Sequence, residues 1–294
     1  MGETLRETIR RLTSEHLDAG HLVMGQCLTA VGWVGGTLPE RRDMTELPMS
    51  DVAQSGFVTG AALVGRRPIY VVRYQGFQWF NAALIVNYAA KSQALWGRSC
   101  SLLIRSIAME GGIGPATGSS QHSLFTRMPG VRVLAPMTPG EWRTAYEEFM
   151  AGDDVIYLSE HRGAYDVCEE FSWSMPRPDI VLFPISITRA AALQAARELL
   201  EEEGIKVAVH PIWRLKPLEV LKNDLLRAPL GGMVLDDDFT NGAASAIVLE
   251  LHRSTGARMQ ALGLDDRTAG FATRFDNLPP DAARIKALVK ETAR

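Results

Sequence analysis

The chain has 294 residues, of which 46% are apolar and 22% charged, as expected for a globular protein large enough for two domains. A formal net charge of −3 gives no reason to expect a nucleic acid or an anionic membrane as a partner. The three cysteines lack a zinc-binding spacing, and no apolar run approaches the ~20 residues of a membrane span. We therefore expect a cytoplasmic protein without a metal site of its own.

The first half of the chain alternates helical patterns with short runs of apolar and β-branched residues, which is typical of an α/β sheet. The expected helices cover 5–17, 51–64, 78–96 and 139–150. The expected strands cover 21–24, 69–73, 101–105, 131–135 and 155–159. Residues 27–44 and 111–120 contain several glycines and no sustained period, so both stretches are predicted to be loops.

The pattern breaks at 161–178, which we interpret as a linker between a domain at 1–160 and a domain at 179–294. After the break, expected strands cover 180–184, 206–210, 232–236 and 258–262. Expected helices cover 188–203, 217–227, 241–254 and 280–292. The predicted fold class is α/β, with two domains that each contain a parallel or mostly parallel sheet flanked by helices.

Several polar and aromatic residues fall where these elements begin or end. Asp51 is at the start of a helix, Tyr74 and Phe77 follow a strand, and His122 closes the glycine-rich loop. Ligands of open parallel sheets bind at the carboxyl ends of the strands, so these residues are candidates for a site. Histidine is also the side chain most easily poised for proton transfer near neutral pH.

The residues alone leave structural explanations open for each candidate. Ser50 and Asp51 are both good helix N-caps, and His122 can cap the turn that follows it. The aromatic residues around 77 are more often core residues than a platform for a cofactor. The acidic run 236–238 is interpreted as a solvated strand end rather than a metal site.

Taken together, the chain resembles the beta subunit of the first component of 2-oxo-acid dehydrogenase complexes. This family combines a transketolase-like pyrimidine-binding domain with a transketolase C-terminal domain. The resemblance covers essentially the whole chain and depends on the order and spacing of its motifs. The matching runs are PMSD (48–51), GAALVGRRP (60–68), NYAAK (87–91), QHS (121–123), PGVRVLAP (129–136), VIYLSE (155–160), RLKPL (214–218) and VLDDDFTNG (234–242).

The resemblance implies a thiamine diphosphate site whose pyrimidine end is bound by this chain. Phe77 falls where the family stacks a ring on the aminopyrimidine, with Tyr74 beside it, and His122 falls on the family's proton-transferring histidine. Asp51 falls on the glutamate that hydrogen-bonds the pyrimidine and promotes formation of the nucleophilic ylid. Gln26 replaces an acidic residue of the family.

The aspartate at 51 is one methylene shorter than the family's glutamate, so its carboxylate retreats by roughly 1.5 Å, and a misplacement near 1 Å can cost on the order of 10²-fold in rate. A shifted backbone, help from Glu46 or weak activity are the alternatives that this departure leaves open.

The family binds the cofactor diphosphate and Mg²⁺ through a Gly-Asp-Gly segment on a separate domain, and this chain has no such segment. The resemblance therefore implies an alpha-type partner that holds the Mg²⁺ and the diphosphate, in an alpha2beta2 assembly. The expected reaction is decarboxylation of a 2-oxo acid and transfer of the acyl or two-carbon unit to a lipoyl group, a carrier-protein thiol or an aldehyde. The alternatives are the C-terminal subunit of a split transketolase and a catalytically silent assembly subunit.

Overall fold

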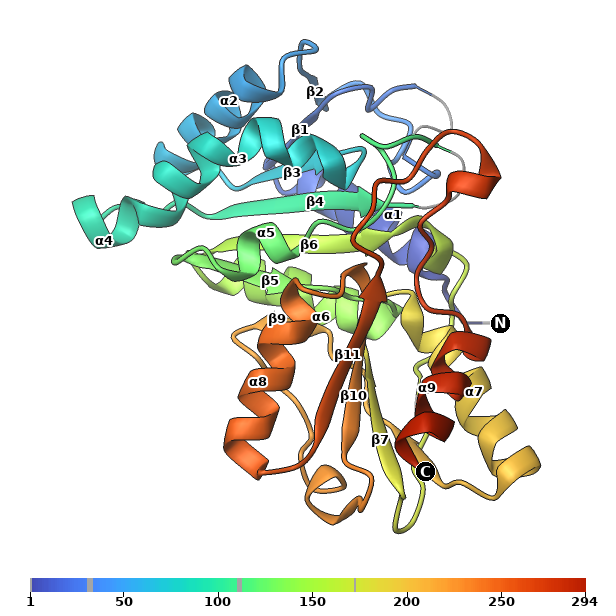
Figure 1. The fold of residues 1–294 in the computed structure, drawn as a ribbon. Coiled ribbons are helices and arrows are strands. Elements are labelled where there is room, and N and C mark those ends of the chain that lie inside the picture. Colours follow the sequence, from blue (N-terminus) through green and yellow to red (C-terminus); the bar gives the residue numbers. More distant parts are fainter. Residues whose placement is uncertain (1, 31–33, 110–112, 172) are drawn as a thin grey trace. The chain divides into compact units, whose positions relative to one another are not determined.

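The computed structural model describes residues 2–30, 34–109, 113–171 and 173–294, which form two compact units. The first unit comprises 1–109 and 113–170, and the second consists mainly of 171–294 (Figure 1). The boundary between the units follows Glu170, which lies inside the predicted linker 161–178. The domain boundaries drawn from the sequence stay a prediction. Both units alternate helices with mainly parallel strands, so the predicted α/β class is confirmed.

The sheet of the first unit contains parallel strands in the order β2-β1-β3-β4-β6-β5. Their bounds are Leu22–Gly25 (β1), Thr45–Glu46 (β2), Pro68–Val72 (β3), Leu102–Ala108 (β4), Val131–Leu134 (β5) and Val155–His161 (β6). The five strands expected from the sequence are present. The sequence did not indicate β2, because a strand of two residues is too short to show a period.

Helices cover both faces of this sheet (Figure 1). Their bounds are Leu5–Asp18 (α1), Asp51–Leu63 (α2), Gln78–Asn87 (α3), Ser92–Trp96 (α4), Ser123–Thr126 (α5) and Pro139–Ala151 (α6). On one face, the Tyr70 hydroxyl of β3 bonds Gln54 of α2 and Asn81 of α3. Tyr70 is opposite Ile104 in β4, so the next residue, Arg105, points to the other face, where it lies over Trp142 of α6.

The expected helix 78–96 is divided in the structure. Tyr88 departs from helical geometry with φ −118° and ψ −64°, and a 3₁₀ turn at Ala89–Lys91 separates α3 from α4. Ala89 in the turn and Ser92, the first residue of α4, are buried, and the Ser92 hydroxyl donates to the Arg98 carbonyl at 2.6 Å. Burial of these two residues therefore overrides the continuous helical spacing of the sequence.

The described parts of the two predicted loops, 27–30 with 34–44 and 113–120, contain no helix or strand. Residues 31–33 and 111–112 of these loops lie outside the described residues.

The second unit has a parallel sheet in the order β11-β10-β7-β8 and a short strand β9 (Arg214–Lys216). The bounds are Ile180–Pro184 (β7), Val207–Val209 (β8), Gly232–Phe239 (β10), Met259–Leu264 (β11), Thr188–Glu203 (α7), Ala243–Thr255 (α8) and Ala282–Thr292 (α9). Side chains from α7, α9, β7, β8 and β10 form its buried apolar core. Within the described residues, no helix combines the length and apolarity needed to cross a membrane.

Two expectations for the second unit are wrong. The helix predicted at 217–227 is absent apart from a 3₁₀ turn at Leu225–Arg227. Its apolar residues have helical spacing, but Leu221 is 68% exposed and Leu226 62% exposed, and burial of a shared face is what stabilises most helices in proteins. The acidic run Asp236–Asp238 is buried within β10 instead of forming a solvated strand end.

The buried His16 in α1 makes the stability of the first unit sensitive to acid. Its Nδ1 lies 3.1 Å from the Tyr146 hydroxyl and its Nε2 lies 2.8 Å from the Arg67 carbonyl. Burial lowers the pKa of His16 to about 4, against about 6.5 in an unfolded chain. Between pH 6.5 and about 4, His16 is therefore protonated in the unfolded chain but stays neutral in the folded chain. The free energy of unfolding falls by up to about 3 kcal/mol as the pH falls to about 4.

Denaturant unfolding between pH 4 and 7 measures this effect. We expect His16→Gln to show a flatter dependence on pH than the parent chain, while His252→Gln, at an exposed position in α8, keeps the parent slope. Parallel curves for the parent and His16→Gln would contradict the prediction.

Candidate active site

The candidate residues follow strands that are neighbours in the first sheet. Gly25 at the end of β1 is opposite Glu46 of β2 and Val71 of β3, and Val72 is opposite Ser106 of β4. Parallel strands place their carboxyl ends at one edge of the sheet. Gln26, Asp51, Tyr74, Phe77 and His122 all come from segments that leave this edge.

Asp51 is the first residue of α2 and is half-buried. Ser50 occupies the N-cap position, but its side chain makes no capping hydrogen bond. Burial raises the pKa of the Asp51 carboxyl, against a smaller lowering by its own backbone N–H. Burial raises the pKa of the Tyr70 phenol, and the Asp51 charge adds to this rise.

Glu46 is hydrogen-bonded to the backbone of the turn after β1. Its carboxylate accepts hydrogen bonds from the backbone N–H groups of Cys27 and Leu28, the latter at 2.9 Å. These bonds hold the turn after β1, in which Cys27 has a φ of +56°. The Glu46 carboxylate therefore fixes the segment that carries Gln26, and its help to the short side chain at 51 stays a prediction.

Phe77 ends a 3₁₀ turn, Gln75–Phe77, that follows β3 directly. Its ring is half-buried and meets the Tyr74 ring edge to face, with centroids 5.7 Å apart. The Arg73 guanidinium lies over the other ring, 5.3 Å from the Tyr74 centroid. The pair is thus held by its neighbours, and Phe77 keeps surface available for a flat ligand.

His122 is fully buried and is fixed by a polar network that the sequence analysis missed. Its Nδ1 lies 3.2 Å from the Ser159 Oγ, and Gln75 donates to the same Oγ at 2.7 Å. Gln75 also accepts from the backbone N–H of Gln121 at 2.6 Å. A signal for Ser159 exists in the sequence, because a serine interrupts the buried apolar run of β6 near its carboxyl end.

Gly76 allows the loop before His122 to lie close to the turn that carries Phe77. A Cβ at residue 76 would lie 1.9 Å from the Ala116 carbonyl oxygen. We expect Gly76→Ala to force this backbone apart and to lower the free energy of unfolding of the isolated chain by about 1–3 kcal/mol.

The midpoint of denaturant unfolding tests this prediction. Gly60→Ala in α2 is the matched control, because a Cβ there meets no atom within 4 Å and alanine is the better helix former. Equal midpoints for the two variants would contradict the close approach.

Arg105 and Glu160 form a buried ion pair behind the site. Arg105 donates through Nε at 2.6 Å and through Nη2 at 2.9 Å to the two carboxylate oxygens of Glu160. Nη2 also donates to Thr37 at 2.9 Å, and the Tyr165 hydroxyl donates to Glu160 at 3.2 Å. Because Thr37 belongs to the loop after β1, this cluster fixes that loop to β4 and β6.

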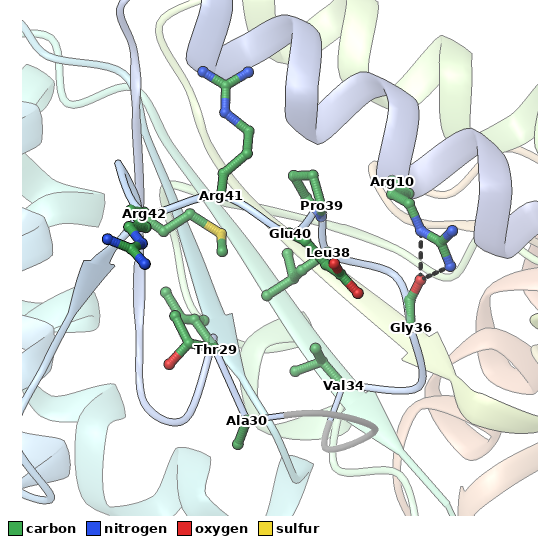
Figure 2. Close-up of a pocket in the computed structure, with 12 residues that line it drawn as sticks. Arg10, Thr29, Ala30, Val34, Gly36, Leu38, Pro39, Glu40, Arg41 and Arg42 are labelled. Carbon is green, nitrogen blue, oxygen red and sulfur yellow. Dashed lines mark hydrogen bonds between the residues drawn. The ribbon is translucent and has the colours of Figure 1, made fainter.

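A cavity of about 720 Å³ lies in the first unit beside the loop after β1 (Figure 2). Its apolar lining includes Leu28, Val34 and Leu38, and the Arg10 Nε donates to the Gly36 carbonyl at 2.8 Å. None of the five candidate residues lines it. The cavity is therefore distinct from the carboxyl-edge site.

The chemistry of the carboxyl-edge site suits a flat, basic heterocycle. Phe77 offers an aromatic face, and the half-buried Asp51 offers a carboxylate that can accept from, or share a proton with, a ring nitrogen. His122 supplies a buried group that can exchange a proton.

Comparisons with known proteins find similar chains. Residues 24–167 match the model of the transketolase pyrimidine-binding domain. The acetoin:2,6-dichlorophenolindophenol oxidoreductase subunit beta of Cupriavidus necator is 27% identical over 194 residues, which are 60% of this chain and 56% of that protein. The 2-oxoisovalerate dehydrogenase subunit beta of Bacillus subtilis is 26% identical over 193 residues, 59% of this chain and 58% of the relative.

A third relative matches over more of its length. The pyruvate dehydrogenase E1 component subunit beta of Chaetosphaeridium globosum is 26% identical over 243 residues, 74% of this chain and 73% of the relative. The alignment thus spans less than three-fifths of the first two relatives and about three-quarters of the third.

The fold also matches a solved structure described as "Split gene transketolase, inactive beta4 tetramer". The TM-score is 0.75, with 18% identity over 99% of this chain and 98% of that one. At this identity the match establishes the shared fold alone.

Proposed function

We propose that this chain is the beta-type subunit of a thiamine-diphosphate-dependent enzyme, because residues 24–167 match the model of the transketolase pyrimidine-binding domain. The assembled enzyme decarboxylates a 2-oxo acid and transfers the resulting acyl or two-carbon unit. The observation that carries the proposal is the half-buried carboxylate of Asp51 at the sheet edge that also presents Phe77. Its cytoplasmic location remains a prediction.

In this proposal each residue has a distinct task. Asp51 binds a pyrimidine ring nitrogen, Phe77 and Tyr74 bind the ring face, Gln26 borders the site from the turn after β1, and His122 exchanges a proton with the substrate. When bound, thiamine diphosphate would supply a nucleophilic carbon for the reaction with the substrate carbonyl. An alpha-type partner holds the diphosphate and Mg²⁺.

An uncharged surface beside Asp51 supports the need for a partner. Helices α2 and α3 contain no charged residue other than Asp51, and they pack side by side (Figure 1). Their exposed apolar side chains form what we call the α2–α3 face, which consists of Val52, Phe57, Trp79 and Phe80. Contiguous exposed apolar surface depleted of charge is typical of a protein–protein interface. We propose that the alpha-type partner covers this face in an alpha2beta2 assembly.

A charge placed on the α2–α3 face tests this assignment. We expect Phe57→Glu to weaken binding to the alpha-type partner at least tenfold, because a carboxylate would be buried without a counter-ion. Leu226→Glu, at a similarly exposed leucine of the second unit, serves as control and keeps the parent affinity. Equal affinities for both variants, measured by calorimetry or interferometry, would place the partner elsewhere.

The activity itself is tested with the chain and an alpha-type subunit that carries a Gly-Asp-Gly segment. The complex is titrated with thiamine diphosphate and Mg²⁺ and then supplied with a panel of 2-oxo acids and ketose phosphates. Saturable binding with release of CO₂ from a 2-oxo acid supports the proposal. Turnover of ketose phosphates alone indicates a split transketolase, and binding without any turnover indicates a silent assembly subunit.

A further inference from the structure

We propose that Gln75 and Ser159 act as positioning residues that fix the tautomer of His122, so that the neutral imidazole carries its proton on Nε2. This inference deepens the proposed function, on which the catalytic importance of His122 rests. All three side chains are buried in the first unit.

The orientation of the Gln75 amide is the first step. Its Oε1 lies 2.6 Å from the backbone nitrogen of Gln121, which can only donate. Its Nε2 lies 3.2 Å from the Ser106 carbonyl oxygen, which can only accept. In the flipped orientation, the Gln75 NH₂ group would face the Gln121 N–H, and the Gln75 amide oxygen would face the Ser106 carbonyl oxygen. Neither contact is a hydrogen bond, so the orientation of the Gln75 amide is determined.

The direction of the Ser159 hydroxyl follows from it. Gln75 Nε2 has two hydrogens, one directed to the Ser106 carbonyl and one to the Ser159 Oγ at 2.7 Å. Ser159 therefore accepts from Gln75, and its own proton is available for another acceptor. Within the described residues, the other recorded hydrogen-bond partner of the Ser159 Oγ is His122 Nδ1, at 3.2 Å.

The tautomer of His122 is the consequence. If Ser159 donates to Nδ1, that nitrogen is the acceptor of the neutral ring and the proton is on Nε2. The bond made by one ring nitrogen thus decides the role of the other. In the proposed enzyme, neutral His122 then presents a proton donor through Nε2, which suits stabilisation of a developing oxyanion.

Nitrogen-15 NMR of the full chain, labelled at histidine, tests the assignment without cofactor, partner or substrate. The chain has six histidines, and the His122 signals are identified by their loss in His122→Asn. At a pH where the ring is neutral, we expect correlations that show Nε2 protonated and Nδ1 bare. A spectrum with the proton on Nδ1 would overturn the proposal.

Variants distinguish a specific effect of the Ser159 hydroxyl on His122 from a general change in the surrounding structure. We expect Ser159→Ala to shift the His122 signals toward a mixture of tautomers and Ser159→Thr, which keeps the hydroxyl, to preserve the parent pattern. Ser106→Ala is the matched control, because Ser106 is opposite Ser159 in the sheet and its hydroxyl accepts from Gln78 at 2.7 Å. Equal shifts in Ser159→Ala and Ser106→Ala, or none in either, would refute the role of Ser159. The expected tautomer in a chain without cofactor-dependent activity would refute the proposed function and leave this assignment standing.

Discussion

Asp51→Ala is expected to lower the thiamine-diphosphate-dependent turnover of the assembled enzyme by roughly 10²–10⁴-fold, the range typical of a positioned acid–base group. The reason is that the half-buried Asp51 is the carboxylate that begins α2 at the site edge, and Glu46 is committed to the backbone of Cys27 and Leu28. Steady-state turnover with saturating cofactor measures the loss.

Two further variants make the Asp51 result specific. Asp51→Glu keeps a carboxylate and is expected to lose much less activity than Asp51→Ala. Asp166→Ala removes a carboxylate that is 87% exposed and pairs with Arg6 at the surface, so it is expected to retain parent activity. Parent-like turnover in Asp51→Ala would rule out Asp51 as a catalytic residue.

The second large effect concerns stability. We expect Arg105→Met to lower the free energy of unfolding by about 3–5 kcal/mol, because it leaves the buried Glu160 carboxylate without its counter-ion. Thr37 also loses its bond to Arg105, which releases the loop after β1. Urea unfolding followed by circular dichroism measures the change.

Arg11→Met provides the control for this prediction. Arg11 pairs with Glu3 and Glu15 at the surface of α1, where an ion pair is worth about 0–1 kcal/mol. A similar loss of stability in the two variants would show that burial of the Arg105–Glu160 pair adds nothing to its contribution to the free energy of unfolding.

The strands of both sheets could be predicted because most of them are buried on both sides. The continuous apolar runs of β3, β4 and β7 follow from helices covering each face of a parallel sheet. The segment 217–227 was misread for the opposite reason. Its leucines have helical spacing, but spacing carries no information on whether the fold offers a surface to bury them.

The site was predictable only in part. The family resemblance pointed to Asp51, Phe77 and His122, and the roles of these residues stay predictions. Gln75 and Ser159 were missed because their partnership depends on the registers of β3 against β4 and of β4 against β6, and on the closeness of the loop at Ala116, which one sequence does not reveal. The burial of Asp236–Asp238 likewise depends on their place inside β10.

A structure of this chain with an alpha-type partner, thiamine diphosphate and Mg²⁺ is the most direct test of the proposed site. We predict a pyrimidine ring nitrogen within about 2.5–2.9 Å of the Asp51 carboxylate and the Phe77 ring against the face of the pyrimidine. A cofactor bound with its pyrimidine away from both residues would contradict the proposal.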